Sequence, residues 1–212
     1  MKKLSNKTQK ILIISDSHNL NKLVEKIIKK EKADINICVG DLEQFNDPDT
    51  ILSDSYRDKL FDYWVYGNHE VTIRMIRNVL DGKWWWENMK NSYKTFMLGE
   101  SKVLLTHFFE DDSRIMKTVA KQTGKVIDIT SWKNKVIAEV KPNIVICGHT
   151  HVPTLELGVE YKIKNKTYKF DVLNPGTANV EKNRSKTFTN ATYIVGTIND
   201  GKKPNWKIVK IV

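Results

Sequence analysis

Short apolar runs that end in polar residues recur along much of the chain. Five of them are followed within two residues by histidine, aspartate or asparagine, and they cover Ile11–Ile14, Ile35–Val39, Tyr63–Tyr66, Val103–Leu105 and Ile144–Cys147. Short apolar runs bounded by turn residues are typical of buried strands. The pattern therefore predicts five buried strands, each of which leads into a polar loop.

These polar loops contain every histidine of the chain, namely His18, His69, His107, His149 and His151. Scattered structural histidines would not be distributed in this way. His149 and His151 are two residues apart, and in an extended segment this spacing places both rings on one side, as metal ligands require. Open α/β sheets bind ligands at the carboxyl ends of their strands. The simplest interpretation is one sheet whose strands end at one metal site.

Helical patterns lie between the predicted strands. Apolar residues at helical spacing predict a helix over Asn19–Glu31. Because a strand precedes this helix and another follows it, we expect the two strands to pair in parallel through a right-handed crossover. Asp49 is expected to cap a helix over Thr50–Phe61. Further helices are predicted over Val71–Leu80, Asp111–Thr123 and Ser131–Val140.

Strands dominate the rest of the pattern. One hairpin is predicted around Gly99-Glu100, and two more pairs of strands are predicted around Asn165 and around Asn199-Asp200-Gly201. The paired strands are Thr95–Leu98 with Lys102–Leu105, Leu155–Ile163 with Thr167–Leu173, and Thr192–Ile198 with Trp206–Val212. The chain therefore reads as an α/β protein with a β-rich final third. At 212 residues, we expect a single domain over residues 1–212.

The composition bears on the cellular compartment and on the charge of the surface. The two cysteines, Cys38 and Cys147, lie in predicted buried strands and are interpreted as small core residues rather than a disulfide. Because no disulfide framework is suggested, a cytoplasmic protein is expected. No apolar run is long enough to span a membrane. The formal net charge is +10, and lysines cluster over 26–32 and 162–169. Such clusters are usually solvated faces, but they also predict weak, non-specific binding to nucleic acid.

Taken together, the polar loops resemble the motifs of the metallophosphoesterase (calcineurin-like phosphoesterase) superfamily. The motifs are Asp16-x-His18, Gly40-Asp41, Gly67-Asn68-His69-Glu70, His107 and Gly148-His149-Thr150-His151. All of them occur in the family's order. The segment Asn174-Pro175-Gly176-Thr177 is similar to the loop that closes the site in small single-domain bacterial and phage members. The resemblance implies a four-layer α/β/β/α sandwich of two mixed sheets flanked by helices.

The resemblance also implies two divalent metal ions. Asp16, His18 and His151 would hold the first, whereas Asn68, His107 and His149 would hold the second. Asp41 would bridge both, because each oxygen of a carboxylate can bind one cation. Mixed imidazole and oxygen ligands favour Mn²⁺, with Fe, Zn²⁺ or Ni²⁺ as alternatives. Two such metals about 3.5–4 Å apart can share a hydroxide and clamp a phosphoryl group for in-line attack.

Other roles follow from the resemblance with less support from the residues. His69 is implied to be a general acid that protonates the leaving oxygen, and an ordinary histidine beside the metal ligands is the alternative. Arg74, Gly176 and Thr177 are candidate substrate contacts, with Arg77 and Arg184 as weaker ones. The three tryptophans at 84–86 would line a substrate cleft or a partner surface, or else pack in the core.

Two departures from the family pattern narrow the function. Family phosphoprotein phosphatases continue after the bridging aspartate with Asp-Arg-Gly, whereas this chain continues with Leu42-Glu43-Gln44-Phe45. Small bacterial phosphodiesterases often carry Cys-Asp where this chain has His69-Glu70. We therefore expect hydrolysis of a phosphodiester or phosphomonoester by metal-bound hydroxide, with a small phosphodiester or nucleotide as substrate. The alternatives are a phosphoprotein phosphatase, a nuclease, and an inert scaffold of the same fold.

Overall fold

Two five-stranded sheets form the centre of the described part of the chain. The structure is a computed structural model that describes residues 8–43, 52–70, 93–109, 129–180, 190–199 and 202–211. The first sheet has the strand order β10-β9-β1-β2-β3, and the second has the order β4-β5-β6-β8-β7. Each sheet combines parallel and antiparallel pairs, so both are mixed.

The first sheet joins the two ends of the chain. Its parallel strands are β1 (Gln9–Ile14), β2 (Ile35–Cys38) and β3 (Tyr63–Trp64). The strands β9 (Thr192–Ile198) and β10 (Asn205–Lys210) extend it on the other side of β1. β9 runs antiparallel to β1, with Gly196 opposite Ile11. The carboxyl ends of β1, β2 and β3 therefore lie at one edge of this sheet.

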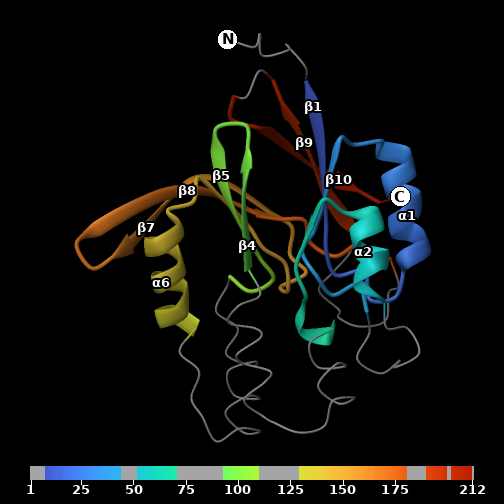
Figure 1. Cartoon of the computed structure of the whole chain (residues 1–212), viewed down its shortest axis with the longest axis horizontal. Coiled ribbons are helices and arrows are strands. Elements are labelled where there is room, and N and C mark those ends of the chain that lie inside the picture. Colours follow the sequence, from blue (N-terminus) through green and yellow to red (C-terminus); the bar gives the residue numbers. More distant parts are fainter. Residues whose placement is uncertain are drawn as a thin grey trace, which may run out of the picture.

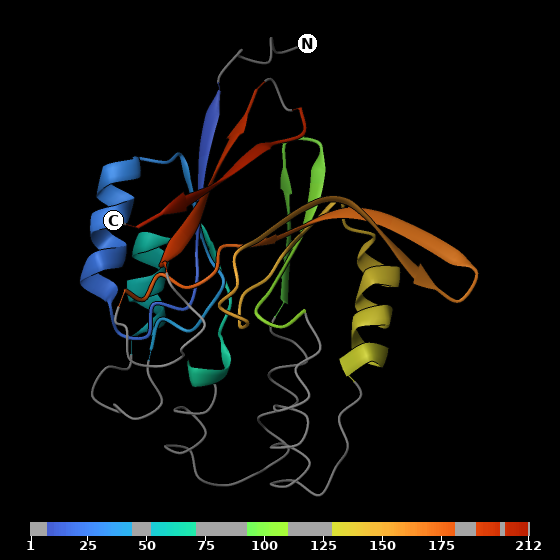
Figure 2. The same ribbon diagram turned by 180° about the vertical axis from the view of Figure 1, so that it is seen from behind.

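The second sheet has a parallel centre and antiparallel edges. Its central strands are β5 (Ser101–Thr106), β6 (Ile144–Ile146) and β8 (Lys166–Asn174), which run in parallel. The edge strands β4 (Tyr93–Leu98) and β7 (Thr154–Ile163) form hairpins with β5 and β8. In both views the β7–β8 hairpin projects beyond the rest of the described chain (Figures 1 and 2).

Helices cover the outer faces of the two sheets. α1 (Asn21–Glu31) and α2 (Asp54–Leu60) lie together on the side of the first sheet, and α6 (Ile129–Val140) lies on the side of the second (Figure 1). α2 begins after Ser53, whose side chain accepts a hydrogen bond from the Tyr56 backbone N–H at 3.2 Å. Within the described ranges, no helix has both the length and the apolar character needed to cross a bilayer.

Alternation along the strands produces the layers. In β1, Ile11 and Ile13 face the core between the sheets, whereas Leu12 and Ile14 face the core beneath α1 and α2. In the second sheet, Val103 and Leu105 of β5 also belong to the core between the sheets, and alternate residues pack with α6. Side chains on strands point to opposite faces in turn. The result is the four-layer sandwich that the family resemblance implies, with helices outside and two sheets inside.

The structure confirms most predicted elements and corrects others. The apolar runs do form strands, but the prediction of a single sheet is wrong, because β1–β3 belong to one sheet and β5 and β6 to the other. The second predicted helix begins at Asp54 rather than Thr50, so Ser53 and not Asp49 provides its N-cap. The predicted helices over 71–80 and 111–123, and the tryptophans at 84–86, lie outside the described residues.

Candidate metal centre

Loops from both sheets meet at the carboxyl ends of the parallel strands. β1 leads into Asp16 and His18, β2 into Asp41, and β3 into Asn68. From the second sheet, β5 leads into His107 and β6 into His149 and His151. Short distances between their side chains bring all of these predicted ligands into one cluster. The site therefore lies where the two sheets meet, and neither sheet could supply it alone.

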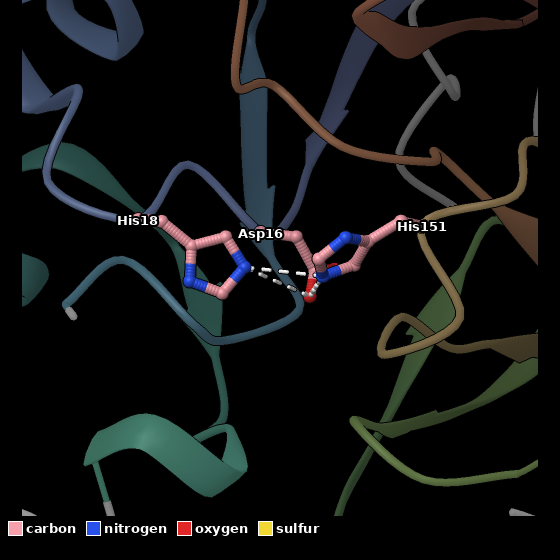
Figure 3. A group of neighbouring side chains, drawn as sticks. All are labelled: Asp16, His18 and His151. Atoms are coloured by element: carbon pink, nitrogen blue, oxygen red, sulfur yellow. Dashed lines mark hydrogen bonds and ion pairs between the residues drawn. The ribbon is translucent and has the colours of Figure 1, made fainter. Parts of the chain in front are cut away.

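The Asp16 group consists of Asp16, His18 and His151 (Figure 3). Nε2 of His151 lies 3.1 Å from Oδ1 of Asp16 and 3.1 Å from Nε2 of His18. Oδ1 of Asp16 is buried and accepts no hydrogen bond from the described residues. A buried carboxylate oxygen facing two imidazole nitrogens is costly unless a cation or proton compensates it. The Asp16 group therefore fits a divalent cation.

The Asn68 group consists of Asn68, His107 and His149. Oδ1 of Asn68 lies 2.9 Å from Nδ1 of His149 and 3.3 Å from Nε2 of His107. The other ring nitrogen of His107, Nδ1, donates a hydrogen bond to the Val39 carbonyl at 2.6 Å. Such a bond fixes the tautomer of a metal-ligating histidine, and here it turns the lone pair of Nε2 toward the cluster. The donor set of one amide oxygen and two imidazoles suits a first-row transition metal.

Asp41 lies between the two groups. Its Oδ2 is 3.4 Å from Nε2 of His107, and its Oδ1 accepts the His69 backbone N–H at 2.8 Å. Asp16, Asp41 and His107 each offer a ligand atom within 4.8 Å of the others. One carboxylate in this place can contact cations on both sides, which is the arrangement that the family resemblance implies.

The carboxylates and imidazoles of the cluster shift one another's pKa values. Burial alone would raise the pKa of Asp41, but the combined attraction of His107, His69 and His18 outweighs burial and lowers that pKa. Burial would lower the pKa of His107, but Asp41 raises it to about 9. Burial lowers the pKa of His18, which favours its neutral form. A cation would supply the compensation that the His107 proton supplies otherwise, and metal binding at such sites releases protons.

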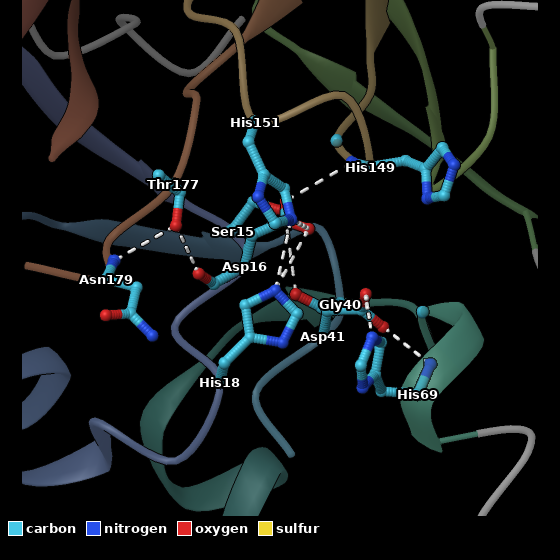
Figure 4. A network of polar contacts seen from close by, with 12 residues as sticks. Ser15, Asp16, His18, Gly40, Asp41, His69, His149, His151, Thr177 and Asn179 are labelled. Atoms are coloured by element: carbon cyan, nitrogen blue, oxygen red, sulfur yellow. Dashed lines mark hydrogen bonds and ion pairs between the residues drawn. The ribbon is translucent and has the colours of Figure 1, made fainter. Parts of the chain in front are cut away.

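The 174–177 segment connects the ligand loops to one another. The Thr177 hydroxyl donates to the Asp16 carbonyl at 2.7 Å (Figure 4). Nδ2 of Asn174 donates to the Gly148 carbonyl at 3.0 Å and to Oγ1 of Thr150 at 3.0 Å. These bonds connect the loop after β1 with the loop after β6. The segment therefore links the two sheets at the site, as the site-closing loop of the resemblance would.

The proposed substrate contacts have other partners or are not described. The backbone N–H of Gly176 donates to Oδ1 of Asn174 at 2.9 Å, and the Thr177 side chain is buried. The structure thus gives both residues a part in holding the loops, and their contact with substrate stays a prediction. Arg74, like the weaker candidates Arg77 and Arg184, lies outside the described residues.

The backbone of the ligand loops is tightly folded. Five candidate ligands have a positive φ, namely Asp16 at 55°, His18 at 45°, Asp41 at 52°, His149 at 70° and His151 at 61°. Residues other than glycine rarely adopt this left-handed conformation. A Cβ at Gly67 would collide with the Asp41 side chain, and one at Gly148 would collide with Oγ of Ser15. Close approach of the loops explains why these two motif positions are glycine.

His69 is placed beside the cluster, with part of its side chain exposed. Its ring lies edge-on to that of His18 at 4.7 Å between centroids, and its Nε2 is 4.0 Å from Oδ2 of Asp41. A partly exposed imidazole thus lies next to the candidate bridging carboxylate. His18, Asp41 and His69 also satisfy the distances of a metal-ligand group. The general-acid role of His69 therefore stays a prediction.

One charged cluster beneath the site was not predicted from the sequence. Both oxygens of Glu70 accept backbone N–H groups: Oε2 from Asp41 and Gly67, each at 2.8 Å, and Oε1 from Leu42 at 2.6 Å. Burial and the nearby charge of Asp41 raise the pKa of Glu70 to about 7, while Arg57 acts in the opposite direction. Glu43 and Arg57 complete the cluster. The only signal in the sequence was the position of Glu70 at the end of the Gly67–Glu70 motif.

Comparison with known proteins agrees with this geometry. A model of the calcineurin-like phosphoesterase superfamily domain matches residues 10–201. No curated protein matches the chain. The crystal structure of a predicted phosphoesterase from Streptococcus pneumoniae TIGR4 is similar to this chain, with 18% sequence identity and a TM-score of 0.51. The match covers 97% of this chain and 99% of that chain.

Two further solved structures resemble the chain. A metallophosphoesterase from Sphaerobacter thermophilus has 15% identity and a TM-score of 0.50, covering 96% of this chain and 88% of that one. Vacuolar Protein Sorting 29 from Cryptosporidium parvum has 15% identity and a TM-score of 0.47 over 96% and 98% of the two chains. At such low identity, the Streptococcus and Sphaerobacter structures support the fold alone. Since the family model spans most of the sequence and all of the ligand loops, the chain belongs to the calcineurin-like phosphoesterase superfamily.

Proposed function

We propose that the protein is a two-metal phosphoesterase that hydrolyses a small phosphodiester or a nucleotide. The observation that carries this proposal is the position of Asp41 between the Asp16 group and the Asn68 group. A single structural metal would need one closed set of ligands. Two donor groups that flank a shared buried carboxylate instead favour a dinuclear centre.

Each residue of the centre has a defined task in this proposal. The Asp16 group would hold one metal, the Asn68 group the other, and Asp41 would contact both. When bound, the two metals would lower the pKa of a water molecule and stabilise the negative charge of the phosphoryl group. The mixed imidazole and oxygen donors favour Mn²⁺ over Mg²⁺. His69, partly exposed beside Asp41, would protonate the leaving oxygen.

The segment after Asp41 supports a small substrate over a phosphoprotein. Leu42 and Glu43 are both buried, and Oε1 of Glu43 contacts the Arg57 guanidinium at 2.5 Å. Neither residue carries a positive charge that could bind a phosphate at the site. The phosphate-binding arginine that phosphoprotein phosphatases of the family carry after the bridging aspartate therefore has no counterpart at these two positions.

Metal analysis and a substrate panel test the proposal. Protein stripped with chelator and reconstituted with Mn²⁺ should hold two metals per chain by elemental analysis. It should hydrolyse at least one of an aryl diester, an aryl monoester and a cyclic nucleotide, with chelated protein as the control. A saturating ratio of one metal or less would contradict the dinuclear centre. Two bound metals without hydrolysis of any substrate, single-stranded DNA included, would instead favour an inert scaffold.

A further inference from the structure

A buried arginine lies beneath the ligand loops without reaching the site. We propose that Arg57 is a positioning residue that fixes the spacing of the Asp41 and Asn68 loops through Glu70. This inference rests on the proposed function, because spacing of these loops matters only if they hold metals. Arg57 comes from α2, an outer helix, and its side chain is 1% exposed, so it cannot bind substrate itself.

Glu70 is the residue that joins the two loops. Its carboxylate accepts N–H groups of Asp41 and Leu42 from the loop after β2, and of Gly67 from the loop after β3. Hydrogen bonds from backbone N–H to a carboxylate are among the stronger ones in proteins. Because Asn68 follows Gly67 directly, the carboxylate of Glu70 sets the distance between a candidate bridging ligand and a candidate ligand of the second metal.

Arg57 is held rigidly against this carboxylate. Its Nη2 lies 2.5 Å from Oε1 of Glu43 and 3.7 Å from Oε1 of Glu70. Its Nη1 donates to the Leu52 carbonyl at 2.6 Å and lies 3.8 Å from Asp54, which is exposed. The guanidinium also lies over the rings of Trp64 and Tyr66, at 5.5 and 5.3 Å from their centroids. Charge, hydrogen bonds and aromatic contacts thus fix it in one place.

The charges explain why the arginine is needed. Glu43 and Glu70 are both completely buried, and Asp41 adds a third buried carboxylate nearby. Removing one partner of a buried ion pair leaves an uncompensated charge, which is strongly unfavourable. Without Arg57, repulsion from the Glu43 and Asp41 carboxylates would push the Glu70 carboxylate out of its position against the loops. The ligand loops would then lose the connection that holds their spacing.

The experiment compares Arg57→Met, Arg57→Lys and Lys59→Gln. Lys59 is an exposed cation on the same helix, so Lys59→Gln removes a charge without touching the cluster. We expect Arg57→Met to lower Mn²⁺ affinity by about 10–100-fold, as loss of a partner behind metal ligands typically does. Arg57→Lys should recover part of this loss, and Lys59→Gln should match the original protein. Electron paramagnetic resonance should show weakened coupling between the two Mn²⁺ ions in Arg57→Met only.

The outcomes separate the two proposals. If the original protein binds no Mn²⁺ pair, the proposed function fails. If it does bind the pair and a folded Arg57→Met binds it with equal affinity and coupling, the positioning role is overturned. Folding is checked by circular dichroism and thermal unfolding in chelator.

A second pair of variants keeps the test decisive if Arg57→Met does not fold. Glu70→Gln removes the charge that accepts the loop N–H groups, whereas Glu43→Gln weakens the hold on Arg57 and leaves the bonds of Glu70 to the loops in place. We expect Glu70→Gln to lose about 10–100-fold in Mn²⁺ affinity and Glu43→Gln to lose clearly less, because Arg57 keeps its bond to the Leu52 carbonyl and its contact with Glu70. Equal losses in both variants would mean that the cluster acts only by stabilising the fold, and would overturn the proposal.

Discussion

The Asp16 group and the Asn68 group hold their ligands in different ways. In the Asn68 group, the Val39 carbonyl fixes the ring of His107, and Glu70 fixes the loop that carries Asn68. In the Asp16 group, Nδ1 of His18 is buried and has no hydrogen-bond partner among the described residues, and the side chain of His151 is 31% exposed. The ring of His107 is therefore fixed by a backbone carbonyl, whereas the ring of His18 has no such bond among the described residues.

This difference suggests that the two groups have different functions within one centre. Preorganised ligands bind a metal tightly, because little ordering is needed when the metal arrives. Ligands with unfixed rings bind more weakly, but they can adjust as a substrate enters. We therefore expect the Asn68 group to anchor the centre, while His18 in the Asp16 group adjusts as the substrate enters.

The largest loss of activity should come from Asp41→Asn, because this variant should weaken metal binding in both groups. Asp41 contacts both groups, so loss of its charge should weaken both metals together. The loss of activity should exceed the roughly 10²–10⁴-fold expected for loss of a general acid, because both metals are weakened. Elemental analysis and the hydrolysis rate measure it. Loss of only one metal would show that Asp41 belongs to a single group.

His69→Asn tests whether a residue beside Asp41 belongs to either group. As a non-ligand, His69 can be replaced while both metals stay bound. As a general acid, it should contribute about 10²–10⁴-fold in rate on alkyl or nucleoside esters. The loss should shrink on p-nitrophenyl esters, whose leaving group needs little protonation. Release of a metal from this variant would instead make His69 a ligand and add a fourth residue to the Asp16 group.

Metal titration of the unmodified protein measures the comparison directly. Because His107 is fixed by a backbone carbonyl and His18 is not, we expect Mn²⁺ to bind in two steps. The affinities should differ by about 10–100-fold, the usual contribution of such fixing bonds. Isothermal titration calorimetry resolves two such steps. A single step with a stoichiometry of two would mean that the groups are equivalent despite their different surroundings.

Thr177→Val should give the smallest effect and should act on one group only. The Thr177 hydroxyl donates to the Asp16 carbonyl, and valine keeps the shape while removing the donor. The lost hydrogen bond is worth about 0.5–1.5 kcal/mol, so we expect up to about a tenfold loss in the weaker binding step. The tighter step serves as the internal control. A change confined to the tighter step would reverse our assignment of the two steps.

Local patterns predicted the strands well but could not assign them to sheets. The strand Thr192–Ile198 has the predicted bounds, and β4 and β5 form the predicted hairpin. Turn residues and alternation act over a few neighbours, so they are visible in the sequence. The pairing of β1 with β9 joins residues that are far apart along the chain, and no local pattern encodes it. The interpretation of one sheet failed for this reason.

The site was predictable to the extent that it follows the strands. Each candidate ligand comes directly after an apolar run, so its position at a strand end could be inferred. Arg57 lies in a short helix between Tyr56 and the exposed Asp58, in a polar stretch of sequence that does not indicate burial. Its partners Glu43 and Glu70 are also ordinary loop residues by composition. A buried charge becomes visible only when three segments are packed together.

The left-handed backbone of the ligand loops has a consequence for protein engineering. Each non-glycine residue in that conformation costs roughly 1–2 kcal/mol, and Asp16, His18, Asp41, His149 and His151 all adopt it. Glycine at any of these positions would relieve the strain while removing a candidate ligand. A screen for heat resistance alone would therefore reward variants that have lost the centre, because stability and activity compete at strained sites. Directed evolution of this protein needs selection for metal retention at every round.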